Sequence, residues 1–223
     1  MAMEECPSGG AKCVEMAKKK HETDLQTKYP GMIQRKGDTL VIRAASGKIN
    51  AFKDNRSDDG SDPFIIYNAW GALPNLDWVV IRVGYIEGGG HVLVSLNSGH
   101  VLEANGHGGP VLSPDSRRLM MFSQDMDAGY NDNYIAIYQI DKNNAKLEIL
   151  LSGDRKMSPN GSINYEDDFW GPSKPRWVDN ETVAYDEDRY VDRSGMQSTH
   201  IQLKLINGKW QKSITGKSPV VKN

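Results

Sequence analysis

The chain has 223 residues, a formal net charge of −2 at pH 7 and a hydrophobic content of 38%. Because no basic face dominates, this charge balance argues against nucleic acid or an anionic membrane as a partner. The longest apolar runs have five or six residues, whereas spanning a bilayer takes roughly 20, so no membrane insertion is expected. The 22 glycines, together with the low hydrophobic content, favour short strands and many turns over long helices.

The two cysteines, Cys6 and Cys13, lie in the segment CPSGGAKC. Their spacing suits neither a zinc site, which needs two further ligands, nor a CxxC redox pair. We therefore expect a local disulfide, and closing a loop of about eight residues would stabilise the fold by about 2–3 kcal/mol. Disulfides persist outside the cytosol. The polar residues that directly follow Met1–Met3 are typical of a mature protein whose signal peptide has been removed, so a periplasmic or secreted protein is expected.

One short helix is predicted near the N-terminus, over residues 11 to about 28. Apolar positions recur there at helical spacing, and Pro30 with Gly31 ends the pattern. His21 falls on the apolar side and is expected to be half-buried. Residues 1–31 are thus predicted as a helical segment, 32–216 as a single β domain and 217–223 as a tail.

After Gly31 the hydrophobic period changes to two, which predicts strands. Apolar strands that begin near residues 40, 78, 119 and 183 recur at intervals of about 40, each after a bend that carries Asp or Asn. The last interval is longer because it contains residues 154–174, whose Gly, Pro, Ser and Asn content predicts a long surface loop. The dipeptide Asn207-Gly208 is typical of two-residue β-turns and predicts a tight hairpin.

A period of about 40 residues is typical of propeller-type arrays. We therefore predict an all-β, mainly antiparallel fold built from about four propeller-like β-units, with one short N-terminal helix. The array would be a small or partial propeller, or two packed antiparallel sheets.

The segment VLSPDSRRLMMFS, residues 111–123, resembles the opening of blades in TolB-like and WD40-like β-propellers, where a Ser-Pro-Asp-Gly turn precedes an apolar strand. Ser116 stands where that pattern has glycine, and no Trp-Asp dipeptide closes a blade. The resemblance implies antiparallel blades. It implies no catalytic residues, because propellers carry unrelated functions.

Motifs for catalysis and metal binding are absent from the sequence. There is no G-x-S-x-G elbow for a nucleophilic serine, no phosphate-binding loop, and no HxH or HExxH pair for zinc. The Gly-rich stretch 106–110 is interpreted as a connector between β-units. No catalytic residue, metal ligand or cofactor is therefore predicted.

Acidic loops offer two alternatives to a protein without metal ligands or catalytic residues, namely a calcium site and a glycoside hydrolase site. Residues 55–62 partly match a calcium loop, with oxygen-bearing side chains at alternate positions, and residues 125–132 could gather carboxylates around a hard cation. The other interpretation is that Asp and Asn bond to their own backbone. The acidic runs 166–168 and 186–188 could flank a glycosidic bond, although adjacent acids on exposed loops are ordinarily solvated.

Aromatic residues flank several polar loops. Trp70 and Tyr190 belong to this group, and rings in such places suit protein recognition because they bury much area at little entropic cost; the alternative is that each ring caps the end of a sheet. Trp78, Trp177 and Trp210 are instead predicted in strands or the core. Loop contacts are expected at His107, Asp125, Asp127, Tyr130, Asp132, Phe169 and Trp170.

These observations favour a non-enzymatic, exported protein-binding module. Its loops, 106–110, 125–133 or 154–174, would enter a cleft of another protein, as a periplasmic inhibitor or immunity protein does against a toxin or cell-wall hydrolase. One alternative is a carbohydrate-active or metal-dependent hydrolase that uses loop carboxylates. Another is a structural subunit of an envelope complex.

Overall fold

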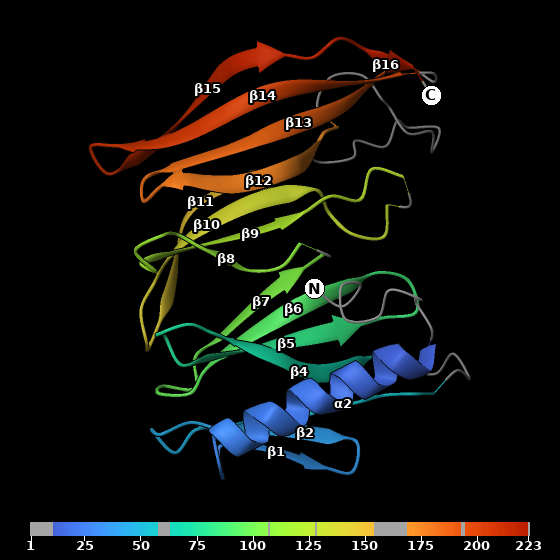
Figure 1. Ribbon diagram of the computed structural model, residues 1–223, viewed down its shortest axis with the longest axis vertical. Helices are drawn as coiled ribbons and strands as arrows, with labels where there is room; N and C mark the ends of the chain where they lie inside the picture. Colours follow the sequence, from blue (N-terminus) through green and yellow to red (C-terminus); the bar gives the residue numbers. More distant parts are fainter. Residues whose placement is uncertain are drawn as a thin grey trace. The chain divides into compact units, whose positions relative to one another are not determined.

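The computed structural model describes residues 11–57, 63–106, 108–127, 129–153, 169–192 and 195–222. These residues form one helix and four mainly antiparallel sheets (Figure 1). The chain divides into two compact units: residues 1–104 with 141–144, and residues 105–140 with 145–223. No helix in the described part of the chain is long and apolar enough to cross a membrane.

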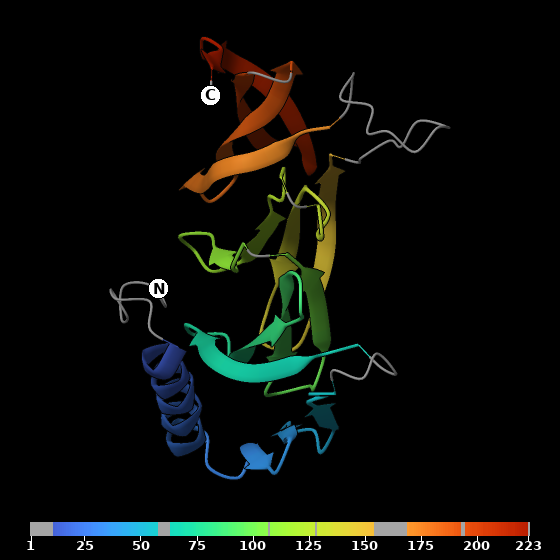
Figure 2. The ribbon, with the colours of Figure 1, turned by 90° about the vertical axis from the view of Figure 1, so that its right-hand side faces the viewer.

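The first unit contains the helix and two sheets, with strand orders β1-β2-β3 and β4-β5-β6-β7. Its elements are α2 (Ala11–Lys28), β1 (Ile33–Lys36), β2 (Thr39–Arg43), β3 (Ile49–Lys53), β4 (Ile66–Leu73), β5 (Trp78–Gly84), β6 (Gly89–Ser95) and β7 (Val101–Asn105). Helix α2 packs beside β4 and β1 (Figure 2).

The second unit contains the other two sheets, with orders β11-β10-β9-β8 and β12-β13-β14-β15, and β16 pairs with β14. Its elements are β8 (Val111–Leu112), β9 (Arg118–Ser123), β10 (Tyr134–Ile140), β11 (Ala145–Ser152), β12 (Gly171–Asp179), β13 (Thr182–Asp192), β14 (Gly195–Ile206), β15 (Lys209–Lys217) and β16 (Val221–Lys222).

The predicted helix and strand recurrence are confirmed. Helix α2 covers residues 11–28, and the apolar strands expected near 40, 78, 119 and 183 are β2, β5, β9 and β13, each the second strand of its sheet. The hairpin at Asn207-Gly208 connects β14 to β15, with φ of 50° and 75° at its two residues. The predicted loop 154–174 is too long, because Gly171–Lys174 already belong to β12.

The core of the first unit lies where α2 and its two sheets meet. Leu25 of α2, Leu40 of β2 and Ile81 of β5 belong to one buried cluster. His21 of α2 is half-buried, as predicted, and its ring centroid lies 4.5 Å from that of Trp70. Trp70 itself is 8% exposed, so the prediction that it is a loop aromatic is wrong; it lies in β4 at an irregularity of the β4–β5 pairing.

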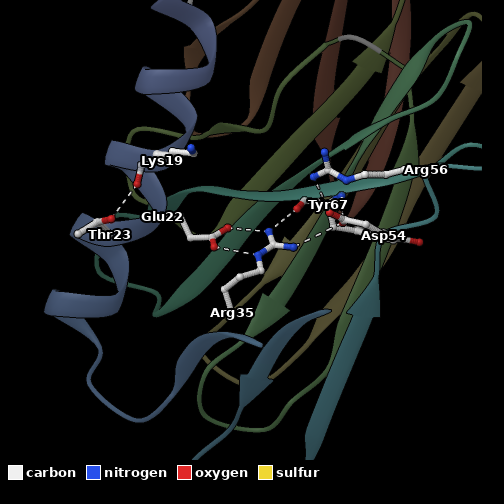
Figure 3. A network of polar contacts seen from close by, with 7 residues as sticks. All are labelled: Lys19, Glu22, Thr23, Arg35, Asp54, Arg56 and Tyr67. Carbon is white, nitrogen blue, oxygen red and sulfur yellow. Dashed lines mark hydrogen bonds and ion pairs between the residues drawn. The ribbon is translucent and has the colours of Figure 1, made fainter. Parts of the chain in front are cut away.

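Arg35 links three separate parts of the first unit (Figure 3). Its guanidinium donates to both carboxylate oxygens of Glu22 on α2, at 2.9 and 2.7 Å, and to the carbonyl of Tyr67 on β4. It also lies 3.5 Å from Asp54, whose side chain is 2% exposed and also accepts from Tyr67 N and Arg56. The planar fork of arginine matches this set of acceptors.

The core of the second unit lies between the inward faces of its two sheets. Met120 and Ile135 from the β8–β11 sheet pack with Val183, Tyr185 and Ile201 from the β12–β15 sheet. Trp78, predicted in the core, is fully buried in the first unit. Trp177 and Trp210, also expected in strands, are partly buried against the core of the second unit.

The turn before β9 explains the Ser-Pro-Asp pattern. Ser113 Oγ donates to Asp115 Oδ1 at 2.7 Å and accepts from Arg118 N at 3.0 Å, while Asp115 Oδ1 also accepts from Arg117 N. Ser116 closes the turn with φ of 57°. This left-handed conformation is unfavourable for a residue with a Cβ, so serine occupies position 116 at an energetic cost.

We expect Arg35→Ala to lower the free energy of unfolding by about 2–3 kcal/mol, because it leaves the buried Asp54 carboxylate with one fewer cation and removes the polar link between Glu22 of α2 and Tyr67 of β4. Urea unfolding followed by circular dichroism measures this loss. Arg43→Ala, an exposed position on β2, is the matched control and should change stability by less than about 0.5 kcal/mol. Equal losses in the two variants would contradict the linking role of Arg35.

We expect Ser116→Gly to raise the free energy of unfolding by about 0.5–1 kcal/mol, since glycine removes the left-handed strain. A thermal shift measured by calorimetry would show it. Ser213→Gly, in β15, should do the opposite, because glycine weakens a strand interior. A loss of stability in Ser116→Gly would show that the turn is unstrained.

Candidate functional site

The loop from Gln124 to Asn133 is organised around one carboxylate. Asp125 Oδ1 accepts from Gly129 N at 2.8 Å, and Oδ2 accepts from Tyr130 N at 2.8 Å and Asn131 N at 2.9 Å. Asn133 Oδ1 in turn accepts from Asp125 N at 2.6 Å. We call this segment the Asp125 loop; of its residues, 124–127 and 129–133 are described, and these bonds tie both parts to the Asp125 carboxylate and backbone.

This arrangement lowers the pKa of Asp125 below its ordinary value. Burial alone would raise the pKa, but the hydrogen bonds from the N–H groups of Gly129, Asn131 and Tyr130 outweigh that effect. The carboxylate is therefore ionised at neutral pH. The predicted alternative, in which loop Asp side chains bond to their own backbone, is confirmed for Asp125.

Contacts with the β12–β15 sheet anchor the Asp125 loop. Gln124 Nε2 donates to Asp188 Oδ2 at 3.1 Å, and the hydroxyl of Tyr190 donates to Asp127. Met126 is buried, and a methyl group on Gly171 would lie 2.9 Å from its sulfur. The loop therefore approaches β12 more closely than a side chain at position 171 would allow. Tyr130, at the loop tip, is 57% exposed.

The sheet next to this loop has a polar face. Asp186 pairs with His200 across β13 and β14, and Asp188 pairs with Ser198. Because side chains alternate along a strand, these four lie on one face, while Val183, Tyr185 and Ile201 on the other face enter the core. We call the first set the β13–β14 polar face.

A chain of three polar groups crosses this face. His200 Nδ1 lies 2.6 Å from Asp186 Oδ1, and His200 Nε2 lies 3.2 Å from the hydroxyl of Ser218, which follows β15. Lys174 Nζ reaches the second oxygen of Asp186 at 3.3 Å. Burial would raise the pKa of Asp186, but the hydrogen bonds from His200 and Lys174 lower it overall.

Sequence reasoning missed Ser218 and His200. Asp186, His200 and Ser218 lie on different strands or strand ends, and no local sequence motif connects them. The Asn207-Gly208 hairpin sets the pairing of β14 with β15 only from Ile206–Lys209 to Ile201–Ile214. A register shift between His200 and Ile201 then places His200 opposite Gly216, so the sequence carried no signal for this contact.

Glu187, between Asp186 and Asp188, points to the core side. Its carboxylate accepts from Tyr185 OH at 3.1 Å and pairs with Lys212 and with Arg189 at 3.4 Å. Burial and the adjacent Glu187 charge raise the pKa of Tyr185. The prediction that the acids at 186–188 are solvated loop charges is therefore wrong: all three are buried in β13.

The other predicted contact residues fall into two groups, one exposed and one buried. Asp127, Tyr130 and Asp132 are exposed on the Asp125 loop. Phe169 and Trp170 are only 4% and 5% exposed, so their predicted exposure is wrong. Trp170 packs in the core with its centroid 6.1 Å from that of Tyr185.

Several predictions fall outside the described residues. His107, the acidic run 166–168 and Cys6, one half of the expected disulfide, all belong to this group. Among the described residues there is no group of three His, Cys, Asp or Glu side chains that could hold a metal ion. At the first proposed calcium loop, Asn55 Oδ1 accepts from Ser57 N, and Asn55 Nδ2 donates to the carbonyl of Pro63.

A hollow of about 430 Å³ lies in the second unit between β11 and the β14–β15 turn. Glu148 is the acidic side chain in its lining, and its Oε2 accepts from Trp210 Nε1 at 2.9 Å and Arg118 Nε at 3.0 Å. Both hydrogen bonds come from side chains of the protein itself and go to the same oxygen of the Glu148 carboxylate. The hollow contains none of the predicted contact residues.

We expect Asp125→Asn to lower the free energy of unfolding at pH 7 by about 1 kcal/mol, because an amide accepts the three backbone bonds less well than a carboxylate. Since the folded pKa of Asp125 is lowered, its contribution is complete above the ordinary value of about 3.9 and is lost as pH falls through the lower folded value. Urea unfolding at pH 7 and pH 3 tests this. The exposed Asp132→Asn is the control, and a pH-independent difference would contradict the assignment.

Comparison with known proteins finds no match: no family model, curated protein or solved structure is similar to this chain. The resemblance of residues 111–123 to propeller blades therefore stays a prediction from the sequence.

Proposed function

We propose that this chain is an exported protein-binding module that acts by steric contact through the Asp125 loop. A periplasmic inhibitor or immunity protein directed at a toxin or cell-wall hydrolase is the form we favour. The observation that carries the proposal is Tyr130, 57% exposed at the tip of a loop whose conformation Asp125 fixes from within.

Pre-organisation makes this loop suitable for binding. A loop that is already ordered loses little conformational entropy when a partner covers it. A tyrosine side chain offers a large contact area with few rotatable bonds. The anchors of the loop are Gln124 on Asp188 and Tyr190 on Asp127, and Tyr130 is 57% exposed.

The exposed charges of the loop favour a partner with a basic cleft. Asp127 and Asp132 are both exposed and lie on either side of Tyr130 in the chain. Carboxylates at the rim of an interface steer association and exclude like-charged partners. A cleft lined by lysine or arginine around an apolar pocket would complement this loop.

Two further parts of the proposal rest on the sequence. The four sheets would be units of a partial propeller-like array, which the shared position of β2, β5, β9 and β13 as second strands supports. Export rests on the expectation from the sequence that Cys6 and Cys13 form a disulfide, since disulfides persist outside the cytosol.

Affinity capture with the full chain as tagged bait tests the function. We expect a partner in the secreted or periplasmic fraction of the native host to bind the unaltered chain and to be lost with Tyr130→Ala. Leu150→Ala, on β11 and 55% exposed, is the control and should keep that partner. Removing a central aromatic anchor typically weakens binding by about 2 kcal/mol or more.

Two results would overturn the proposal. One is a bait that retains nothing beyond a tag-only control. The other is a partner that binds Tyr130→Ala as tightly as the unaltered chain, measured by calorimetry on the purified pair.

A further inference from the structure

We infer that Asp186, His200 and Ser218 form a nucleophilic site, in which Ser218 attacks small carboxylic esters and related electrophiles. The hydroxyl of Ser218 lies 3.2 Å from His200 Nε2, and His200 Nδ1 lies 2.6 Å from Asp186 Oδ1. A nucleophile, a base and a group that orients the base, each within hydrogen-bond reach, define such a site irrespective of chain order. The inference is independent of the proposed binding function, because Tyr130 takes no part in it.

The register of the sheet builds the first half of this site. Asp186 and His200 are direct partners in the β13–β14 ladder, so their side chains leave the same face side by side. On the other side of β14, His200 is opposite Gly216 of β15. A methyl group on Gly216 would lie 3.1 Å from His200 Cδ2, so the missing side chain leaves the space that the imidazole uses.

Backbone contacts position Ser218, two residues beyond Gly216. Ser218 N donates to the carbonyl of Ser198 at 2.9 Å, and the carbonyl of Ser218 accepts from Gln197 Nε2 at 3.2 Å. Both bonds connect the end of β15 to β14. They hold the hydroxyl at His200 Nε2 before any substrate arrives, which is what pre-organisation requires.

Asp186 determines the role of each imidazole nitrogen. It is buried, and it is ionised at neutral pH because His200 and Lys174 stabilise its charge. An ionised carboxylate at Nδ1 favours the tautomer with the proton on that nitrogen. Nε2 is then the acceptor for the hydroxyl proton of Ser218.

A second serine on the same face serves as an internal comparison. Ser198 donates to Asp188 Oδ1 at 2.6 Å, a carboxylate that also accepts from Gln124. The hydroxyl of Ser198 is thus bonded directly to an acid, whereas that of Ser218 is bonded to an imidazole. A carboxylate is the weaker base of the two, so Ser218 is the activated residue.

The open position of the site determines the substrate class. The side chain of His200 is 42% exposed, and Ser218 is half-exposed beside it. Such a face admits a small ester from solvent.

The reaction is an acyl transfer without a change in oxidation state. Ser218 Oγ forms a bond to the carbonyl carbon while its proton passes to His200 Nε2. The bond from that carbon to the alcohol oxygen breaks, and the alcohol leaves with the proton from His200. Water then attacks the acyl group in the same way and returns Ser218 to its hydroxyl form.

An alkyl fluorophosphonate carrying a fluorophore tests the site without requiring turnover. Ser218 Oγ would form a bond to phosphorus and displace fluoride, which leaves with the hydroxyl proton. We expect one adduct per folded chain, located at Ser218 by peptide mass spectrometry. Labelling should be lost in Ser218→Ala, and should fall at least about tenfold in Asp186→Asn and His200→Gln.

Two further variants separate reactivity from folding. Ser213→Ala, another serine of β15, should label like the unaltered chain. Gly216→Ala should slow labelling because its methyl group displaces the imidazole, although it changes no member of the site. Circular dichroism confirms the fold of each variant.

The inference is overturned if the folded chain gives no adduct at Ser218, or if Ser198 or Ser213 labels as fast. It is also overturned if folded Asp186→Asn and His200→Gln label at the unaltered rate. None of these results bears on whether a partner protein binds through Tyr130, so the two proposals succeed or fail separately.

Discussion

The antiparallel register of β13 and β14 is the constraint on which the second unit depends. Because side chains alternate, the same two strands supply Val183 and Ile201 to the core and Asp186 and His200 to the opposite face. A slip of one residue would exchange the two sets. It would bury the polar groups without their partners and expose the apolar ones, so stability and the polar face are specified together.

Charge inside these sheets is tolerated because every buried carboxylate described here has donors. Asp186 has His200 and Lys174, and Glu187, on the other face, has Tyr185, Lys212 and Arg189. In the first unit, Arg35 forms ion pairs with the carboxylates of Glu22 and Asp54. Leaving a buried charge without its partner costs more than the pair contributes, so these sets behave as units.

Short polar side chains control the turns and the loop. Asp115, Asp125 and Asp179 each accept hydrogen bonds from groups within a few residues, and these bonds lower the pKa of each carboxylate. The main donor is the Ser113 hydroxyl for Asp115, and it is backbone N–H groups for Asp125 and Asp179. The same chemistry that closes a tight turn before β9 therefore also orders the longer Asp125 loop. Tyr130 of this loop is 57% exposed.

The sequence by itself determined the local elements. Period-two hydrophobicity located β2, β5, β9 and β13, helical spacing located α2, and Asn207-Gly208 located a hairpin, because each signal depends on residues close in the chain. It could not determine which aromatic rings are buried: Phe169 and Trp170 sit beside a polar segment yet pack in the core. Nor could it assemble Asp186, His200 and Ser218. Their proximity follows from strand pairing across the sheet, a long-range property that only the tertiary structure decides.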